Sequence, residues 1–352
     1  MNKLVLDMND RRPVWACPNW FVDDLHAILP SDWEIVVIEE ENDGSGDGLG
    51  RASDEVLKAV RDARIYLGLG IPREVLIEGD KLEWVHTGAA GVGSSLTPEM
   101  ISNKVCFTNS AGIHAIPIAE TVLGMILYFA RGIDFAVAGM AQGRWITESY
   151  YEHDSPIKEL SESVVGIVGI GGIGKEVALR ATSFGANVIG LRRNPVRDGE
   201  VPEWADERCI EKVRIVSGDA GLKELLAESD YVVISAPATP TTNGMISRRA
   251  LSGIQKGAVL INVSRGSLVD EDALVEKLES GHLRGAGLDV FAQEPLPTGH
   301  PLWSLPNVLL TPHISAVTRA YWKREAGLIV ENVQRFLKKE PLLNEVNKNM
   351  GY

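Results

Sequence analysis

Cysteine is scarce in this chain of 352 residues, and its placement excludes two classes of protein. No C-x-x-C pair occurs, and the three cysteines lie far apart, at Cys17, Cys106 and Cys209. This pattern predicts neither a disulfide framework nor a zinc site, and it fits the reducing conditions of the cytoplasm. The length exceeds the roughly 250–300 residues at which single cores stop growing, so we expect two domains.

Long apolar runs are also absent. The N-terminus, MNKLVLDMNDRRP, carries charges where a signal peptide requires an apolar core. The longest apolar run, Thr121 to Ala130, is shorter than the roughly 18 residues that a membrane span requires. We interpret this run as part of a buried helix.

Basic residues are outnumbered by acidic ones: the chain has 35 Lys and Arg residues and 48 Asp and Glu residues, which gives a net charge of -13. Such a balance argues against a nucleic-acid partner and against binding to a membrane surface. It does not argue against a small anionic substrate, since the field inside a cleft can oppose that of the whole protein.

Short apolar runs alternate with helical patterns along the chain, which predicts an α/β fold with mostly parallel sheets. In the first part, a helix is expected over 53–62, and strands over 14–16, 34–38, 64–70 and 82–86. A long helical region over 114–141 leads to a second series, with strands expected over 164–168, 187–191, 231–236, 258–263, 286–290 and 308–311. Six such strands suit a doubly wound dinucleotide-binding domain. Residues 194–217 are interpreted as a surface excursion, and 317–338 as a C-terminal helix.

A glycine-rich loop follows the first strand of the second series. Gly169, Gly171 and Gly174 form G-x-G-x-x-G between the strand 164–168 and a helix expected over 173–184. The first glycine permits a tight turn, the second lets a pyrophosphate approach the backbone, and the third lets the helix pack on the strand. With Gly172 and Ile173, they predict a dinucleotide site at a helix N-terminus, where free N–H groups and the helix dipole favour an anion.

The carboxylate that selects NAD is missing at the end of the next strand. An Asp or Glu there would accept hydrogen bonds from the ribose 2′-OH, but this chain has Arg192 and Arg193. A guanidinium binds a 2′-phosphate, which a carboxylate repels. NADP is therefore the preferred cofactor and NAD the alternative, in which case the two arginines are solvated surface residues.

Three chemically capable side chains follow later strands. Arg265 comes after the strand 258–263, Glu294 lies just beyond the strand 286–290, and His313 follows the strand 308–311. Ligands of open α/β sheets bind outside the carboxyl ends of the strands, so these residues are expected beside the dinucleotide. Reduction of a 2-keto acid needs such a set: His313 supplies a proton, Glu294 orients and supports the imidazolium, and Arg265 clamps the carboxylate and keto oxygen.

One loop, ENDGSGDGLGRASDE at 41–55, raises the question of a calcium ion. The oxygen-bearing residues Asp43, Ser45, Asp47 and Asp54, with Gly48 among them, follow EF-hand spacing. Gly50 and Arg51 fit poorly, however, and a strand precedes the loop where an EF-hand has a helix. The alternative is a solvated turn, and no metal is expected.

In the order of their motifs, these segments resemble the D-isomer-specific 2-hydroxyacid dehydrogenase family over most of the chain. The similar motifs are TGAAGVGSSL, NSAGIHAIPIAE, GIVGIGGIG, APATPTTNGMIS, NVSRGSLVDEDAL, GAGLDVFAQEPLP and NVLLTPHIS. The resemblance implies that Arg265, Glu294 and His313 are catalytic, and that the backbone N–H groups around Val92 and Gly93 hold the substrate carboxylate. It further implies that Asp289 meets the nicotinamide amide and that the cofactor cleft is lined by Ala236, Pro237, Thr242, Val263 and Ser315.

The resemblance also implies an architecture. We expect a Rossmann dinucleotide-binding domain over 111–315, inserted in a flavodoxin-like substrate domain formed by 1–110 and 316–352. In this family, a segment near QGRWITESYY tends to form a dimer arm, so a homodimer is expected and Trp145 is interpreted as a packing residue. Unlike in long phosphoglycerate dehydrogenases, no regulatory domain is expected after residue 352.

The substrate stays open at this stage, because the loop reads GVGSSL where the family often has Asp/Asn-x-Ile/Val-Asp. The arginine pair is similar to that of NADP-using glyoxylate and hydroxypyruvate reductases, so a small 2-keto acid of that type is expected. Two alternatives keep the fold: a cofactor-sensing interaction protein, and a dehydrogenase of another anion such as phosphite. Five histidines are interpreted as structural, with His114 left unassigned: His26, His86, His153, His282 and His300.

Overall fold

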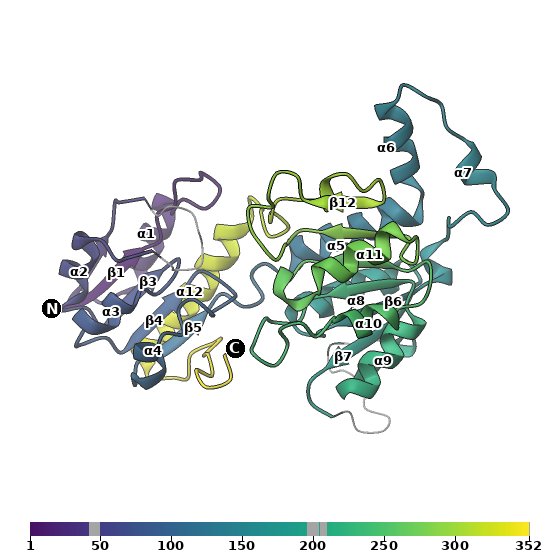
Figure 1. Cartoon of the computed structure of the whole chain (residues 1–352). Helices are drawn as coiled ribbons and strands as arrows, with labels where there is room; N and C mark the ends of the chain where they lie inside the picture. Colours follow the sequence, from purple (N-terminus) through teal and green to yellow (C-terminus); the bar gives the residue numbers. More distant parts are fainter. Residues whose placement is uncertain (42–49, 196–203, 205–209, 352) are drawn as a thin grey trace. The chain divides into compact units, whose positions relative to one another are not determined.

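The computed structural model describes residues 1–41, 50–195, 204 and 210–351 (Figure 1). The chain divides into two compact units. Unit 1 consists of Met1–His114 and Val317–Tyr352, and unit 2 is the inserted stretch Ala115–Ala316. The boundaries expected from the sequence, after residues 110 and 315, lie a few residues before these positions.

Unit 1 is built on a parallel sheet of five strands in the order β2-β1-β3-β4-β5. The strands are β1 (Asn2–Asp7), β2 (Trp33–Val37), β3 (Ile65–Gly68), β4 (Trp84–Thr87) and β5 (Cys106–Asn109). The helices are α1 (Asn19–Ile28), α2 (Asp54–Val60), α3 (Arg73–Glu78), α4 (Pro98–Ser102) and α12 (Tyr321–Lys338). One apolar core joins the sheet to α2, α3 and α4, and a second joins it to α1 and α12. The strand order is that of a flavodoxin-like domain.

One expected strand of unit 1 is wrong, and two observed strands were not expected. Residues 14–16 form no strand but a turn, in which the N–H groups of Trp15 and Ala16 both donate to the carbonyl of Arg12. The first strand is β1, whose short apolar centre lies between charged ends. The strand β5 has four residues, and its polar ends hid it in the sequence.

Unit 2 is built on a parallel sheet of seven strands in the order β12-β11-β10-β9-β6-β7-β8. The strands are β6 (Val164–Val168), β7 (Asn187–Arg192), β8 (Val213–Ser217), β9 (Tyr231–Ile234), β10 (Val259–Asn262), β11 (Gly285–Leu288) and β12 (Val308–Leu310). The helices are α5 (Ala115–Ala130), α6 (Ile133–Ala141), α7 (Glu148–Tyr151), α8 (Gly172–Ser183), α9 (Gly218–Glu228), α10 (Arg248–Ser252) and α11 (Glu271–Glu279). Four short 3₁₀ turns also lie in unit 2, at Leu160–Glu162, Ile210–Lys212, Gly266–Leu268 and Pro301–Trp303. Reversal of the strand order beside β6 defines a Rossmann sheet, which confirms the predicted fold class.

Two regions of unit 2 differ from the sequence-based expectation. The stretch 194–217 is not all excursion, because Val213–Ser217 forms the edge strand β8 and pairs with β7. The helical region 114–141 bends by 74° between α5 and α6, where Gly132 takes a left-handed conformation with φ 64°. In Figure 1, α6 and α7 stand away from the sheet of unit 2.

Within the described ranges, no single helix is long and apolar enough to cross a membrane, although the bent pair α5–α6 reaches the required length and composition together. Most of the apolar residues of α5 are buried in the core of unit 2, as was expected for the apolar run Thr121 to Ala130.

In both sheets all strands are parallel, so their carboxyl ends meet along one edge. We call these the unit 1 edge, formed by the loops after β1, β3, β4 and β5, and the unit 2 edge, formed by the loops after β6, β7 and β9–β12. The candidate site residues lie on these two edges.

Candidate active site

The glycine-rich loop forms an open cradle at the unit 2 edge. Gly169 has φ 102°, and a Cβ there would lie 2.6 Å from the backbone of Ala236. A Cβ on Gly174 would lie 2.3 Å from the carbonyl oxygen of Gly169, so helix α8 and the loop are in direct backbone contact. Gly171 differs from both, since a Cβ there would meet nothing within 4 Å.

This difference matches the roles predicted for the three glycines. Gly171 is the N-cap of α8 and no side chain caps the helix, so the first N–H groups of α8, at Gly172 and Ile173, lack intrahelical partners. The donors and the open face at Gly171 fit the pyrophosphate of a dinucleotide.

The two arginines of the expected 2′-phosphate site lie at the end of β7, which neighbours β6. Arg192 donates to the carbonyls of Asn194 and Pro195, at 3.1 and 2.8 Å. Arg193 is exposed and donates to Thr241 Oγ1 at 3.1 Å. The two guanidinium groups are thus fixed at the rim where the ribose of a dinucleotide is expected.

The turn after β9 is shaped by its own hydroxyl groups. Thr242 Oγ1 donates to the carbonyl of Pro237 at 2.7 Å and accepts from the N–H of Thr239 at 2.8 Å. The carbonyl of Ala236 accepts from the Ser264 hydroxyl, which ties this turn to the loop after β10. The predicted cofactor residues Ala236, Pro237 and Thr242 therefore lie beside Gly169.

Glu294 and His313 form a hydrogen-bonded pair. His313 Nδ1 lies 2.7 Å from Glu294 Oε2, and the other carboxylate oxygen of Glu294 accepts from the N–H of Phe291 at 3.0 Å. The His313 side chain is 43 % exposed, so its Nε2 is accessible to a ligand. With the carboxylate on Nδ1, the ring is oriented for proton transfer through Nε2.

Asp289 holds the segment that carries His313. Its buried carboxylate accepts from Thr311 Oγ1 at 2.6 Å and from the N–H groups of Ile314 and Ser315, both at 2.9 Å. Its carbonyl accepts from the N–H of His313 at 2.9 Å. His313 has φ 54°, a conformation that a non-glycine residue adopts when its surroundings enforce it. Asp289 thus fixes the backbone at His313, and its predicted contact with the nicotinamide amide stays a prediction.

Arg265 lies directly beside the segment that leads to Glu294. A Cβ on the next residue, Gly266, would lie 1.9 Å from the carbonyl carbon of Phe291, so the two loops touch through their backbones. The Arg265 guanidinium donates to the Ser264 carbonyl at 2.7 Å, and no other described residue accepts from it. A guanidinium has five N–H donors, so most of those of Arg265 are available to a ligand.

The backbone near Glu294 has a second support that sequence reasoning missed. Glu271, at the start of α11, accepts from the N–H of Ala292 at 3.0 Å, and its other oxygen lies 3.3 Å from His300 Nε2. His300 therefore acts structurally, as expected, and it does so close to the catalytic candidates. Val263 and Ser315, the remaining predicted cofactor residues, are buried where β10 and β12 end.

The predicted substrate loop, residues 88–95, follows β4 on the unit 1 edge. The N–H groups of Val92 and Gly93 donate to no described residue. Gly93 is exposed, and a Cβ there would meet nothing within 4 Å. Successive free N–H groups are a common anion site, so this loop suits a carboxylate.

Among the described residues, the other histidines and the two cysteines Cys17 and Cys106 show no further site. His86 is buried in unit 1 and has polar partners there, which no sequence pattern predicted. Burial raises the pKa of the Cys17 and Cys106 thiols to about 12, which keeps them protonated and unreactive. Cys209 lies outside the described residues, as do Asp43, Ser45, Asp47 and Gly48 of the calcium hypothesis. Elsewhere in the described ranges, no group of His, Cys, Asp and Glu side chains could hold a metal ion.

A Rossmann sheet with an open glycine cradle, and an Arg, a Glu and a His on neighbouring loops, defines a nicotinamide-dinucleotide oxidoreductase. Residues 123–315 match the NAD-binding domain of the D-isomer specific 2-hydroxyacid dehydrogenases. The chain belongs to this family.

Named relatives agree with the family and differ in substrate. The chain is 32% identical to a D-3-phosphoglycerate dehydrogenase of Methanocaldococcus jannaschii over 303 residues, 85% of this chain and 54% of that protein. It is 33% identical to a glyoxylate reductase of Thermofilum pendens over 302 residues, 84% of this chain and 85% of that protein. The chain thus spans about half the length of the phosphoglycerate dehydrogenases that it matches.

A solved structure matches the whole chain. It is a D-isomer specific 2-hydroxyacid dehydrogenase from Xanthobacter autotrophicus Py2 in complex with NADPH and MES, at 30% identity and a TM-score of 0.78. The match covers 100% of this chain and 99% of that one.

Proposed function

We propose that this chain reduces a small 2-keto acid, of the glyoxylate or hydroxypyruvate type, with NADPH to the 2-hydroxy acid, which is the D-isomer where the product is chiral. The pair of Glu294 and His313, joined at 2.7 Å next to the Arg265 loop, is the observation that carries this proposal. A keto acid needs a proton donor and a clamp for its two oxygen-bearing groups, and these residues provide both.

The cofactor, when bound, supplies the hydride. Gly171, Gly172 and Ile173 would hold its pyrophosphate, and Arg192 and Arg193 its 2′-phosphate. In support of NADPH, a relative that is 30% identical was solved with NADPH. NADH is the alternative if the arginines make no contact with the ribose.

The residues of this chain perform the remaining steps. Arg265 binds the keto oxygen and the carboxylate through its available donors, and the N–H groups of Val92 and Gly93 bind the carboxylate. His313, protonated on both ring nitrogens, donates the Nε2 proton to the keto oxygen as the hydroxyl forms. Glu294 holds the ring through Nδ1 and stabilises its positive charge.

The test is oxidation of NADPH and of NADH by the purified protein in the presence of glyoxylate, hydroxypyruvate, pyruvate or phosphohydroxypyruvate. We expect turnover with at least one keto acid and a lower KM for NADPH. The matched control is His313→Gln, which removes the proton donor and should abolish most of the rate. No turnover by the wild type with any pair would favour a cofactor-sensing interaction protein. Reduction of NADP⁺ or NAD⁺ in the presence of phosphite, with no turnover of any keto acid, would favour a dehydrogenase of that anion.

We also propose that the protein is a homodimer that assembles through α6, α7 and the segment between them. Apolar side chains are exposed there within the single chain: Met140 is 75 % exposed, Tyr151 85 % and Trp145 94 %. Packing of Trp145 within its own chain is therefore wrong, and exposed apolar groups of this kind are typical of a subunit interface. Light scattering should give twice the chain mass for the wild type and a lower mass for Trp145→Ser. A monomer at every concentration would contradict this proposal.

A further inference from the structure

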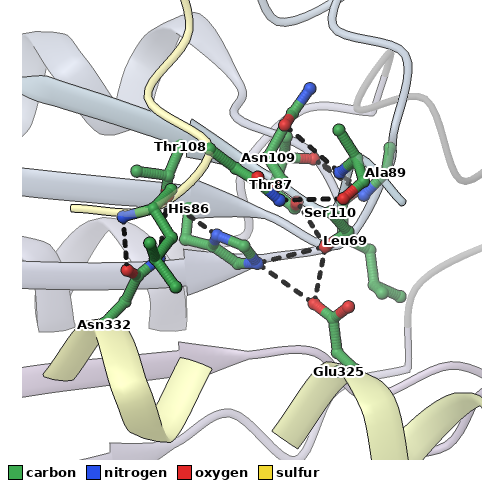
Figure 2. Close-up of polar contacts among 12 residues, drawn as sticks. Leu69, His86, Thr87, Ala89, Thr108, Asn109, Ser110, Glu325 and Asn332 are labelled. Atoms are coloured by element: carbon green, nitrogen blue, oxygen red, sulfur yellow. Dashed lines mark hydrogen bonds and ion pairs between the residues drawn. The ribbon is translucent and has the colours of Figure 1, made fainter. Parts of the chain in front are cut away.

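A buried polar cluster in unit 1 has no role in the proposed function as stated so far (Figure 2). It joins strands β4 and β5 to helix α12, and it lies next to the substrate loop in sequence and in contacts. We call it the Glu325 network. Its five members are fully buried: Trp84, His86, Thr108, Ser110 and Glu325.

The network is centred on one carboxylate oxygen. Glu325 Oε1 accepts from the Ser110 hydroxyl at 2.7 Å and lies 3.0 Å from His86 Nε2. His86 Nδ1 lies 2.8 Å from Thr108 Oγ1, which accepts from Trp84 Nε1 at 2.8 Å. The hydrogens are satisfied if Thr108 donates to Nδ1 and Nε2–H donates to Glu325.

Stability alone explains this arrangement poorly. The second oxygen of Glu325, Oε2, is buried without a hydrogen-bond partner among the described residues. Removal of a carboxylate from water is costly, and apolar residues of similar volume often replace buried ion pairs without loss of stability. A role in positioning its hydrogen-bond partners explains the buried carboxylate of Glu325 better.

Ser110 of the network and its neighbour Asn109 hold the start of the substrate loop through hydrogen bonds to carbonyl groups of the loop. The N–H of Ser110 donates to the Ala89 carbonyl at 3.2 Å, and the Ser110 hydroxyl lies 3.1 Å from the carbonyl of Thr87. Asn109 Nδ2 donates to the Ala90 carbonyl at 2.8 Å. The loop is thus attached at consecutive peptide groups.

Attachment by carbonyls directs the neighbouring N–H groups. In a planar trans peptide, the C=O of one residue and the N–H of the next point in opposite directions. Because the carbonyls of Ala89 and Ala90 point to Ser110 and Asn109, the N–H groups of Ala90 and Gly91 point the other way. Neither of these N–H groups donates to a described residue, and the same holds for Val92 and Gly93.

We propose that the Glu325 network positions the substrate loop, and so sets how tightly the free N–H groups of residues 90–93 bind the substrate carboxylate. Glu325 is a positioning residue that acts through Ser110, and α12 is the element that carries it. This inference rests on the proposed function for its substrate, although the orientation of the loop can be measured without turnover.

The test compares two substitutions at Glu325 with one at Ser110. Glu325→Leu removes the acceptor of Ser110 and His86, whereas Glu325→Gln keeps an acceptor oxygen in the same place. Ser110→Ala removes only the hydroxyl and leaves the main-chain bond to Ala89, so it decides the question if Glu325→Leu does not fold. The control is Ile329→Ala, which alters α12 one turn further on at a buried residue with apolar surroundings.

The first readout is steady-state kinetics with glyoxylate at saturating NADPH, together with NADPH binding by fluorescence. Loss of one or two charge-assisted hydrogen bonds should raise the KM for glyoxylate about 10- to 100-fold in Glu325→Leu, with a smaller rise in Ser110→Ala. Because the carboxylate is bound equally in ground and transition states, kcat should change little. Glu325→Gln should recover most of the KM, and NADPH binding should be unchanged in all variants.

The second readout is amide hydrogen exchange at Gly88, Ala89 and Ser110, whose N–H groups are hydrogen-bonded in the wild type. Exchange there should accelerate in Glu325→Leu and not in Ile329→Ala. The inference is overturned if the variants that fold keep both KM and exchange within twofold of wild type, or if Ile329→Ala has the same effect as Glu325→Leu. If the wild type turns over no keto acid, the proposed function fails, and exchange alone decides whether the network orients the loop.

Discussion

The two sheet edges present different chemical groups to a ligand. On the unit 2 edge, the groups of the proposed proton transfer and substrate clamp are side chains: Arg265, Glu294 and His313 follow neighbouring strands and are partly or fully exposed. On the unit 1 edge, the groups proposed to bind the substrate are backbone N–H groups, and the side chains that support the loop, Asn109 and Ser110, are buried.

Because of this difference, substitutions on the two edges should have different effects. Substitution of one of the unit 2 side chains removes a reacting group directly, so it should affect rate. Substitution of a buried side chain of unit 1 changes the orientation of a loop, so it should affect affinity.

The largest effect is expected at the proton donor of the unit 2 edge. His313→Gln should lower kcat for keto-acid reduction about 10²- to 10⁴-fold, because glutamine cannot donate a proton from an acidic group. His26→Gln, an exposed histidine on α1, is the control. A kcat within threefold of wild type for His313→Gln would remove this residue from the mechanism.

Arg265→Ala should come next, with kcat/KM lowered about 10²- to 10³-fold through loss of the donors on the developing oxyanion. Arg265→Lys should recover only part of this loss, since an ammonium cannot form two parallel hydrogen bonds with a carboxylate. Kinetics of the two variants with one keto acid make the comparison. Equal activity of the Lys variant and the wild type would show that charge alone is needed.

The unit 2 edge could be predicted from sequence because its residue types and their places after strands are both visible there. The N–H groups of Val92 and Gly93 could be named only through the family resemblance, because a backbone donor has no residue type. The Glu325 network could not be predicted at all: His86, Ser110 and Glu325 are far apart in sequence, and only the packing of α12 on the sheet brings them together.

The same contrast holds for the fold. Strands such as β6, β9 and β10 were predictable, since both faces are covered by helices and the sequence is continuously apolar. The strand β1 was missed because the charges of Lys3 and Asp7 bracket its apolar centre. The edge strand β8 was missed because Arg214 is exposed on it and reaches Glu224 and Glu228.

A moderate effect is expected at the arginine pair. Replacement of both residues, Arg192→Asp with Arg193→Ala, should shift the ratio of kcat/KM for NADPH over NADH toward NADH by about 10- to 100-fold. One charge-assisted bond contributes ~1.5–3 kcal/mol, and solvent exposure and the existing bonds of Arg192 to main-chain carbonyls keep the gain at the lower end. Kinetics with both cofactors measure the ratio, and Arg249→Ala, an exposed arginine on α10, is the control. A wild type that prefers NADH, with an unchanged ratio in the double variant, would show that the arginines are solvated surface residues.

The smallest effect is expected on the stability of unit 1, at His114. This ring stacks on Tyr321 at 5.5 Å and meets the edge of Trp15 at 5.7 Å, and burial lowers its pKa from 6.5. A lowered pKa means that, below about pH 6.5, the unfolded chain binds more protons at this residue than the folded one. The free energy of unfolding should therefore decrease as the pH is lowered through this range, by no more than about 1.4 kcal/mol per pH unit.

His114→Phe keeps an aromatic ring in the stack and cannot be protonated. The difference in unfolding temperature between this variant and the wild type should shift in favour of the variant when the pH is lowered from 8 to 5.5. A change in packing adds a constant offset to this difference, which is already present at pH 8. Unfolding temperatures of both proteins at the two pH values give the comparison, and His26→Gln should show no such gain, since His26 is exposed. An offset that stays constant with pH would mean that His114 titrates alike in the folded and unfolded chains.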